Sequence, residues 1–151
     1  MIIIPADLTD PRVLDLLRVH LDGMHAASPP GTVYALDISG LNTPDISFFA
    51  AWDGADLLGF AALKALDDVS GEVKSMRTTQ THLRRGVAGV LLDHLVALAR
   101  SRGYRRLSLE TGSGDDFDPA LTLYRKRGFV NGTVFGEYAA GPFNQFLHLA
   151  L

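Results

Sequence analysis

The chain has 151 residues, 47% of them hydrophobic and 21% charged, which is the size and composition of one folded domain spanning residues 1–151. Lysine and arginine number 14 against 17 aspartate and glutamate, and this net charge of −3 argues against nucleic acid and anionic membranes as partners. The absence of cysteine excludes disulfides, thiol nucleophiles and thiolate metal sites. No apolar run approaches the ~20 residues of a membrane span and no basic leader is present, so we expect a soluble, cytoplasmic protein.

The first half of the chain contains one helical pattern and several strand patterns. A short strand at Met1–Ile4 is followed by a helix that begins at the Asp10–Pro11 cap and ends at Gly23. Residues 28–44 are rich in loop-forming residues and give no clear assignment. Three strand patterns joined by tight turns then predict an antiparallel meander, at Ile46–Trp52, Leu57–Leu66 and Glu72–Thr78.

The second half alternates helices and strands. Val87–Arg102 has the strongest helical pattern in the chain, with a basic last turn and a stop at Gly103. The elements predicted after it are a strand at Leu107–Glu110, a helix at Pro119–Arg127, and two strands near Phe129–Tyr138 and Gln145–Leu149. The order β-α-(loop)-β-β-β-α-β-α-β-β predicts an α/β fold with a mixed sheet and helices on both of its faces.

The segment between the third meander strand and the next helix has the composition of an anion-binding site. A helix that starts at Gly86, with Ala88 and Gly89 in its first turn, presents free main-chain N–H groups and the positive end of its dipole. Arg84 and Arg85 add positive charge beside it. The spacing fits neither a Walker A loop nor the dinucleotide pattern G-x-G-x-x-G. The alternative is an ordinary helix start beside two solvated arginines.

Two motifs in this half resemble the GCN5-related N-acetyltransferase (GNAT) superfamily. Leu83–Ala88 is similar to the family's R/Q-x-x-G-x-G/A motif from Gly86 onward, while Leu83 departs from the usual arginine or glutamine. Ala120–Phe129 resembles a second motif, A-x-x-L-Y-x-x-x-G-F. Both motifs occur in the family's order, and the resemblance covers roughly Ile46–Leu149.

The resemblance implies the GNAT acyl-CoA N-acyltransferase fold, whose sheet opens after the third meander strand to receive acetyl-CoA, the acyl donor substrate. Main-chain groups of Met76 and Thr78 are then expected to bind the pantetheine arm, and the amide near Met76 to polarise the thioester carbonyl. The pyrophosphate is expected on the amides from Arg84 to Gly89. The expected donor-binding residues are Met76, Arg77, Thr78, Leu83, Arg84, Arg85, Gly86, Val87, Ala88 and Gly89. No metal is expected.

The resemblance also implies direct attack of a primary amine on the thioester, which calls for a base and an acid. Tyr124 is the candidate acid, with a tyrosine half-buried against the sheet as the alternative. Glu72 is the first candidate base, and strand alternation places it on one face with Lys74 and Met76. The alternative for Glu72 and Lys74 is a solvated face. His25, which follows the first helical pattern, is the second candidate base.

The function expected is therefore that of an acetyl-CoA-dependent N-acetyltransferase (EC 2.3.1.-) acting on a primary amine of a small molecule or a protein. The alternative is a non-catalytic acyl-CoA-sensing module that binds a protein partner. By analogy, the acceptor side is expected to include Tyr34, Asp37, Phe48, Trp52, Tyr138 and Asn144. The sequence leaves open the acceptor, the base, the acyl chain length and the oligomeric state, including a homodimer.

Overall fold

The computed structural model describes all 151 residues and contains one seven-stranded sheet in the order β1-β2-β3-β4-β5-β7-β6. The strands are β1 (Ile2–Pro5), β2 (Ile46–Asp53), β3 (Asp56–Ala65), β4 (Ser70–Thr78), β5 (Arg106–Thr111), β6 (Val130–Asn131) and β7 (Gln145–Ala150). Only β4 and β5 pair in parallel; every other neighbouring pair is antiparallel. The mixed sheet predicted from the order of elements is confirmed.

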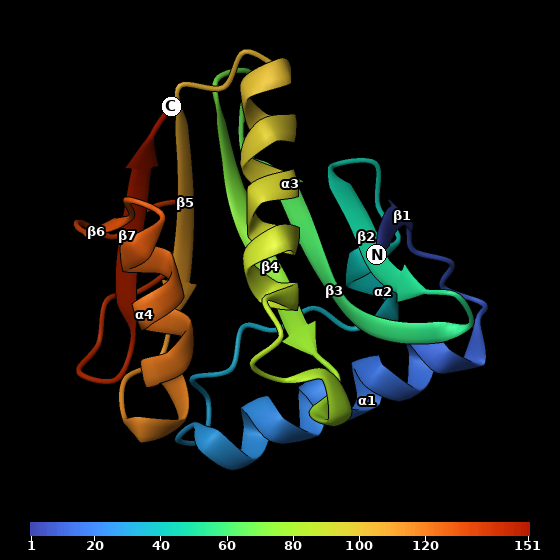
Figure 1. Cartoon of the computed structure of the whole chain (residues 1–151). Coiled ribbons are helices and arrows are strands. Elements are labelled where there is room, and N and C mark those ends of the chain that lie inside the picture. Colours follow the sequence, from blue (N-terminus) through green and yellow to red (C-terminus); the bar gives the residue numbers. More distant parts are fainter.

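Helices cover both faces of the sheet, as predicted (Figure 1). They are α1 (Pro11–Ala27), α2 (Ile38–Leu41), α3 (Val87–Ser101) and α4 (Asp118–Lys126), with single 3₁₀ turns at Gln80–His82 and Asp115–Phe117. One core cluster lies between the sheet and α3 and α4, and includes Leu95 and Phe129. A smaller cluster lies under α1 and includes Leu17 and Phe60. None of the helices combines the length and apolar character that crossing a bilayer requires.

Two predicted boundaries are wrong for identifiable reasons. The first helix continues past Gly23 to Ala27, because Gly23 does not adopt the positive φ with which a glycine ends a helix. Its missing side chain instead leaves room for Arg77, since a Cβ there would lie 3.1 Å from the Arg77 Nη2 atom. The strand predicted near Phe129–Tyr138 is reduced to Val130–Asn131. Beyond it, the Phe135 and Tyr138 rings pack edge-on against each other, with centroids 5.2 Å apart, so the chain folds as a loop rather than alternating in the sheet.

The sheet opens between β4 and β5. These strands are paired only from Ser70 to Glu72 on β4, opposite Arg106 to Ser108 on β5, and they separate beyond this point (Figure 1). Past the paired segment, the facing main-chain N–H and C=O groups of the two strands form no ladder of hydrogen bonds with each other. The fold thus provides an open wedge with unpaired strand edges on both sides.

A β-bulge in β4 changes which side chains face the two helical layers. The register with β3 shifts between Lys74 and Arg77, and Ser75 adopts a left-handed φ of 51°. Val73 and Met76 therefore both pack against the core under α3, while Arg77 bonds to α1. Simple alternation, which predicted Met76 on the face of Glu72 and Lys74, is wrong from the bulge onward.

Candidate functional site

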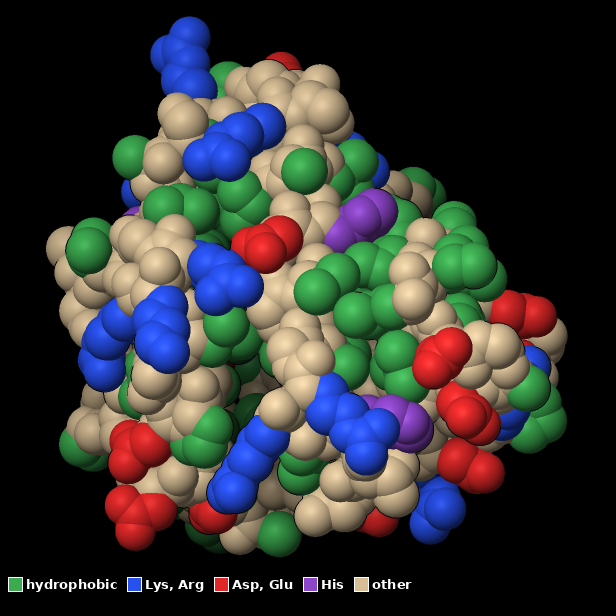
Figure 2. Space-filling model, viewed as in Figure 1, with side chains coloured by type: hydrophobic (Ala, Val, Ile, Leu, Met, Phe, Trp, Pro, Cys, Tyr) green, Lys and Arg blue, Asp and Glu red, His purple; other side chains and the backbone are tan.

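A cavity of about 840 Å³ occupies the wedge between β4 and β5. Its walls come from the second half of α1, all of β4 from Glu72 onward, the segment leading into α3, the end of β5, and α4. Tyr34 and Tyr138, from two long loops, also line it. Figure 2 shows a hollow between α3 and α4 with lysine and arginine side chains on its rim. The cavity is long enough to join a phosphate-sized anion site at one end to a buried polar cluster at the other.

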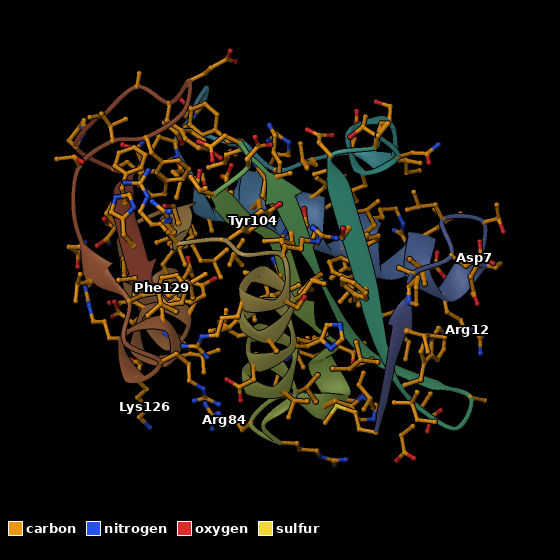
Figure 3. The ribbon with its side chains drawn as sticks, turned by 90° about the horizontal axis from the view of Figure 1, so that it is seen from above. Asp7, Arg12, Arg84, Tyr104, Lys126 and Phe129 are labelled. Carbon is orange, nitrogen blue, oxygen red and sulfur yellow. The ribbon has the colours of Figure 1, made fainter.

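The start of α3 has the geometry of an anion site. None of the N–H groups from Arg84 to Gly89 donates a hydrogen bond to another main-chain group, and the first helical bond runs from Val90 N to Gly86 O, at 3.1 Å. Gly86 has φ +80°, and Arg84 has φ +63°, a left-handed conformation that arginine seldom adopts. Such turns gather several N–H groups around one point, where the helix dipole adds positive potential. Arg84 projects outward from this loop (Figure 3).

The sequence-predicted donor-binding residues differ in how they face this cavity. Leu83, Arg84 and the segment Gly86–Gly89 line it, whereas Arg85 is exposed and does not. Leu83 is 47% exposed, so a hydrophobic side chain stands at the rim where the family motif has a polar one.

The main chain of β4 presents alternate N–H groups to the wedge. The N–H of Thr79 donates to Leu58 O on β3, at 2.9 Å. Because successive N–H groups of a strand point in opposite directions, those of Thr78 and Met76 point away from β3 on either side of Arg77. Met76 and Thr78 therefore have the orientation expected of them, whereas the main chain of Arg77 faces β3 and its side chain crosses to α1.

Tyr124 lies in the wall of the cavity on α4. It is only 8% exposed, and its ring packs against Phe129 with centroids 5.9 Å apart. Burial raises the pKa of Tyr124 to about 12, and no hydrogen bond within the chain offsets this. Its hydroxyl keeps its proton at neutral pH and is a donor available to a ligand.

Glu72 belongs to a buried polar cluster, not to the solvated face that was the alternative. Its carboxylate is 3% exposed and accepts a hydrogen bond from the Tyr138 hydroxyl. Lys74 donates to that hydroxyl at 2.8 Å, and its Nζ lies 3.6 Å from Glu72 Oε2. Glu110 interacts electrostatically with Lys74 and Glu72, and burial raises the pKa of Glu110. Burial likewise lowers the pKa of Lys74, against the opposing effect of the Glu72 charge.

The cluster has a shortage of positive charge, since two carboxylates share one ammonium group. A cationic or amine-bearing ligand at this end of the cavity would balance it. Sequence reasoning missed the bond between Tyr138 and Glu72, which are 66 residues apart, and it missed Glu110. No local sequence signal indicates Glu110, because its proximity to Glu72 and Lys74 follows from the parallel pairing of Glu72 with Ser108.

Most of the remaining candidates lie outside the cavity. His25 is exposed on α1 and does not line the cavity, so its role as a base stays a prediction without support from the geometry. Of the residues expected on the acceptor side, Tyr34 and Tyr138 line the cavity. Phe48 is in the core under α1. Trp52 lies beneath the Arg12 guanidinium, whose Cζ atom is 4.3 Å from the centre of the Trp52 ring.

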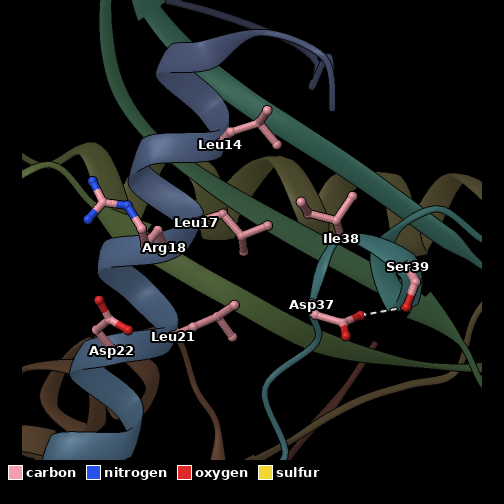
Figure 4. Close-up of a pocket in the computed structure, with 8 residues that line it drawn as sticks. All are labelled: Leu14, Leu17, Arg18, Leu21, Asp22, Asp37, Ile38 and Ser39. Carbon is pink, nitrogen blue, oxygen red and sulfur yellow. Dashed lines mark hydrogen bonds between the residues drawn. The ribbon is translucent and has the colours of Figure 1, made fainter.

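A second, smaller pocket of about 330 Å³ lies between α1 and α2 (Figure 4). Leu14, Leu17 and Leu21 point across it toward Ile38. Of its two acidic residues, Asp37 is already engaged as the cap of α2, accepting hydrogen bonds from Gly40 N at 2.9 Å and from the Ser39 hydroxyl at 2.7 Å. Arg18 and Asp22 are exposed at this pocket, and no buried titratable pair like Glu72 and Lys74 lines it, so the larger cavity is the candidate active site.

The known proteins that this chain is similar to are acetyltransferases. Residues 13–129 match the model of the acetyltransferase (GNAT) family. The N-acetyltransferase YsnE of Bacillus subtilis, named as uncharacterised, is 46% identical over 141 residues, covering 93% of each chain. YedL of Escherichia coli, named likewise, is 45% identical over 145 residues, covering 96% of this chain and 91% of its own.

Solved structures share the fold at low sequence identity. A GNAT family acetyltransferase from Elizabethkingia anophelis with acetyl-CoA bound superimposes with a TM-score of 0.70 at 18% identity, covering 99% of this chain and 97% of that one. An acetyltransferase from Bacillus subtilis in complex with CoA gives 0.73 at 19% identity, with the same coverage.

One histidine of the cavity wall is buried in its neutral form. His20 on α1 is 5% exposed, and its Nδ1 accepts a hydrogen bond from Arg77 Nε at 3.0 Å. Burial, followed by the nearby Arg77 charge, lowers the pKa of His20 to about 4. Because His20 Nδ1 accepts the proton of Arg77 Nε, it carries no proton of its own while this hydrogen bond is intact.

Acidification should therefore destabilise the wild type more than His20→Gln, whose amide oxygen can still accept from Arg77. As the pH falls, the unfolded chain binds the His20 proton near 6.5 and the folded chain only near 4, so stability present above 6.5 is lost toward 4. The drop from 6.5 to about 4 corresponds to roughly 3 kcal/mol. Urea unfolding measured between pH 7.5 and 4 checks this. Identical pH dependence in both proteins would contradict it.

Proposed function

This chain belongs to the acetyltransferase (GNAT) family, and from that premise we propose that it moves the acetyl group of acetyl-CoA to a primary amine by direct attack in a ternary complex. The acceptor is an amine of a small molecule or a protein. The family assignment predicted from the two sequence motifs is confirmed, and acetyl-CoA is the donor substrate of this family. A single domain formed by residues 1–151 performs the reaction in this proposal.

The observation that supports this function best is the continuity of one cavity between two kinds of group. At one end, the free amides from Arg84 to Gly89 suit a diphosphate. At the other, the buried Glu72 cluster suits an amine. The edge of β4 between them offers the N–H groups of Met76 and Thr78 to an extended arm carrying amide groups. These groups match the charge and the hydrogen-bonding capacity of a coenzyme A thioester.

In the proposed mechanism the Met76 N–H stabilises the negative charge that develops on the thioester oxygen. The attacking amine, whose pKa in solution is about 10, must lose a proton. Tyr138 lines the cavity beside Glu72 and already donates its hydroxyl proton to the Glu72 carboxylate. A proton from the amine therefore passes to the Tyr138 oxygen while the Tyr138 proton moves to Glu72, so the phenol remains neutral.

Tyr124 acts on the leaving group. The departing thiolate is the conjugate base of an alkyl thiol, with a pKa of about 8.5, well below the value of about 12 for Tyr124. Complete proton transfer from Tyr124 to sulfur is therefore uphill. The hydroxyl instead contributes a hydrogen bond that strengthens as charge accumulates on the sulfur.

The direct test is release of free thiol from acetyl-CoA in the presence of a panel of primary amines. Amine-dependent release supports the transferase. Binding of acetyl-CoA with no release above the buffer rate would overturn it and favour the acyl-CoA-sensing module, which needs the donor site but no base or acid.

Replacing Gly86 by glutamate should lower the affinity for acetyl-CoA by at least about 100-fold, because a carboxylate then stands where the diphosphate must bind. Gly103→Glu is the matched control. Gly103 has nearly the same left-handed conformation, φ +78° against +80°, and equally open surroundings, but it lies at the opposite end of α3. Calorimetric titration of both variants separates charge from backbone strain. Equal affinity in the two variants would exclude the α3 start as the anion site.

Tyr124→Phe should lower kcat by roughly 100-fold while leaving the Kd for acetyl-CoA within about threefold, since the hydroxyl acts on charge that forms only during the reaction. Tyr104→Phe provides the control, because Tyr104 is also buried but does not line the cavity. Steady-state thiol release and calorimetry measure the two quantities. Wild-type kcat in Tyr124→Phe would remove Tyr124 from the mechanism.

A further inference from the structure

The Arg77 side chain is held against α1 by one edge of its guanidinium group. The bulge at Ser75 turns Arg77 to the α1 face of β4, where α1 passes the end of the strand (Figure 1). Nε donates to His20 Nδ1 at 3.0 Å, and Nη2 donates to His20 O at 3.4 Å. Gly23 gives the group its space, since a Cβ there would lie 3.1 Å from Nη2. These contacts occupy only part of its five N–H donors.

Arg77 has no acidic partner. It forms none of the ion pairs of the chain, and its one strongly polar partner, His20, is uncharged. Burial lowers the pKa of Arg77, and no carboxylate acts in the opposite direction. A guanidinium that is partly withdrawn from water without a counter-charge is unfavourable unless a ligand supplies one.

The other cations of the cavity are already engaged or lie elsewhere. Lys74 is bonded to Tyr138 and faces Glu72. Arg84 is exposed beside the diphosphate site. Arg77 lines the same cavity from the α1 side of β4, apart from the strand edge whose N–H groups face the donor. Arg77 is thus the cation available to an anionic group on the acceptor.

Two hydroxyl groups of the same cavity also have no partner. The Oγ atoms of Ser28, at the end of α1, and of Ser75, in the bulge, are buried and form no hydrogen bond. Ser75 as a whole is only 9% exposed. Buried hydroxyl groups are nearly always hydrogen-bonded, so a polar ligand is the natural partner of both. Ser28, which caps the end of α1, and Ser75, on β4, flank the acceptor side.

We propose that the acceptor is a free amino acid, whose carboxylate binds the open edge of the Arg77 guanidinium while its amine faces Tyr138 and Glu72. This rests on the proposed acetyl transfer. A planar guanidinium matches a carboxylate with two parallel N–H···O bonds, which an ammonium group cannot do. The two ends of the acceptor site then have opposite charge, positive at Arg77 and negative at the Glu72–Glu110 cluster. His20 is a positioning residue that holds the guanidinium in its orientation.

The test compares each amino acid with its own amide, which keeps the amine and side chain but lacks the carboxylate. The panel consists of the common L-amino acids, β-alanine and 4-aminobutyrate, each beside its amide, with thiol release as the readout. The wild type should prefer the best acid over its amide by about 10- to 100-fold in kcat/KM, chiefly through KM. Arg77→Gln should reduce this ratio to near one, Arg77→Lys should restore part of it, and Arg12→Gln, on the exposed start of α1, should leave it unchanged.

The outcomes separate this inference from the proposed function. Turnover of amides as fast as acids by the wild type overturns the amino-acid acceptor while leaving the acetyltransferase intact, and it does so even where Arg77→Gln fails to fold. An equal loss on acids and amides in a folded Arg77→Gln shows a merely structural role and also overturns it. No thiol release with any amine overturns both proposals.

Discussion

Hydrogen bonding between β4 and β5 stops after three residues of each strand, and the main-chain groups beyond must find other partners. The site depends on this interruption. A fully paired sheet would bury the N–H groups of Met76 and Thr78 in a ladder and would close the cavity of about 840 Å³. The parallel pairing, which is confined to Ser70–Glu72, holds the closed end of the wedge together, while α3 and α4 pack over its sides.

Energetically unfavourable backbone conformations are concentrated along this wedge. Ser75 and Arg84 are the two non-glycine residues with positive φ in the chain, and both line the cavity. Such conformations persist only where the surrounding structure enforces them, and they are typical of ligand sites. The conformation of Ser75 turns Arg77 toward α1. The conformation of Arg84 directs the main-chain N–H groups ahead of α3 toward one point.

The strong local patterns were sufficient to predict the main elements. Val87–Arg102 has helical periodicity and a glycine at each end, so α3 and the free amides at its start follow from local sequence. The polar cluster around Glu72 did not follow, because it depends on long-range contacts. Tyr138 reaches Glu72 across 66 residues, and the bulge at Ser75 reverses the facing that alternation predicts for Met76. Local rules predict that Gly23 ends the first helix. Gly23 instead leaves room for the side chain of Arg77, which lies 54 residues further along the chain.

We propose that coenzyme A lies in the wedge with its diphosphate on the amides that begin α3. Titration of ¹⁵N-labelled protein with coenzyme A, followed by amide NMR shifts, tests this residue by residue. The largest shifts are expected on Arg84 to Gly89 and on Met76 and Thr78. Unshifted amides at those positions, with the changes gathered instead around the α1–α2 pocket near Ile38, would contradict it.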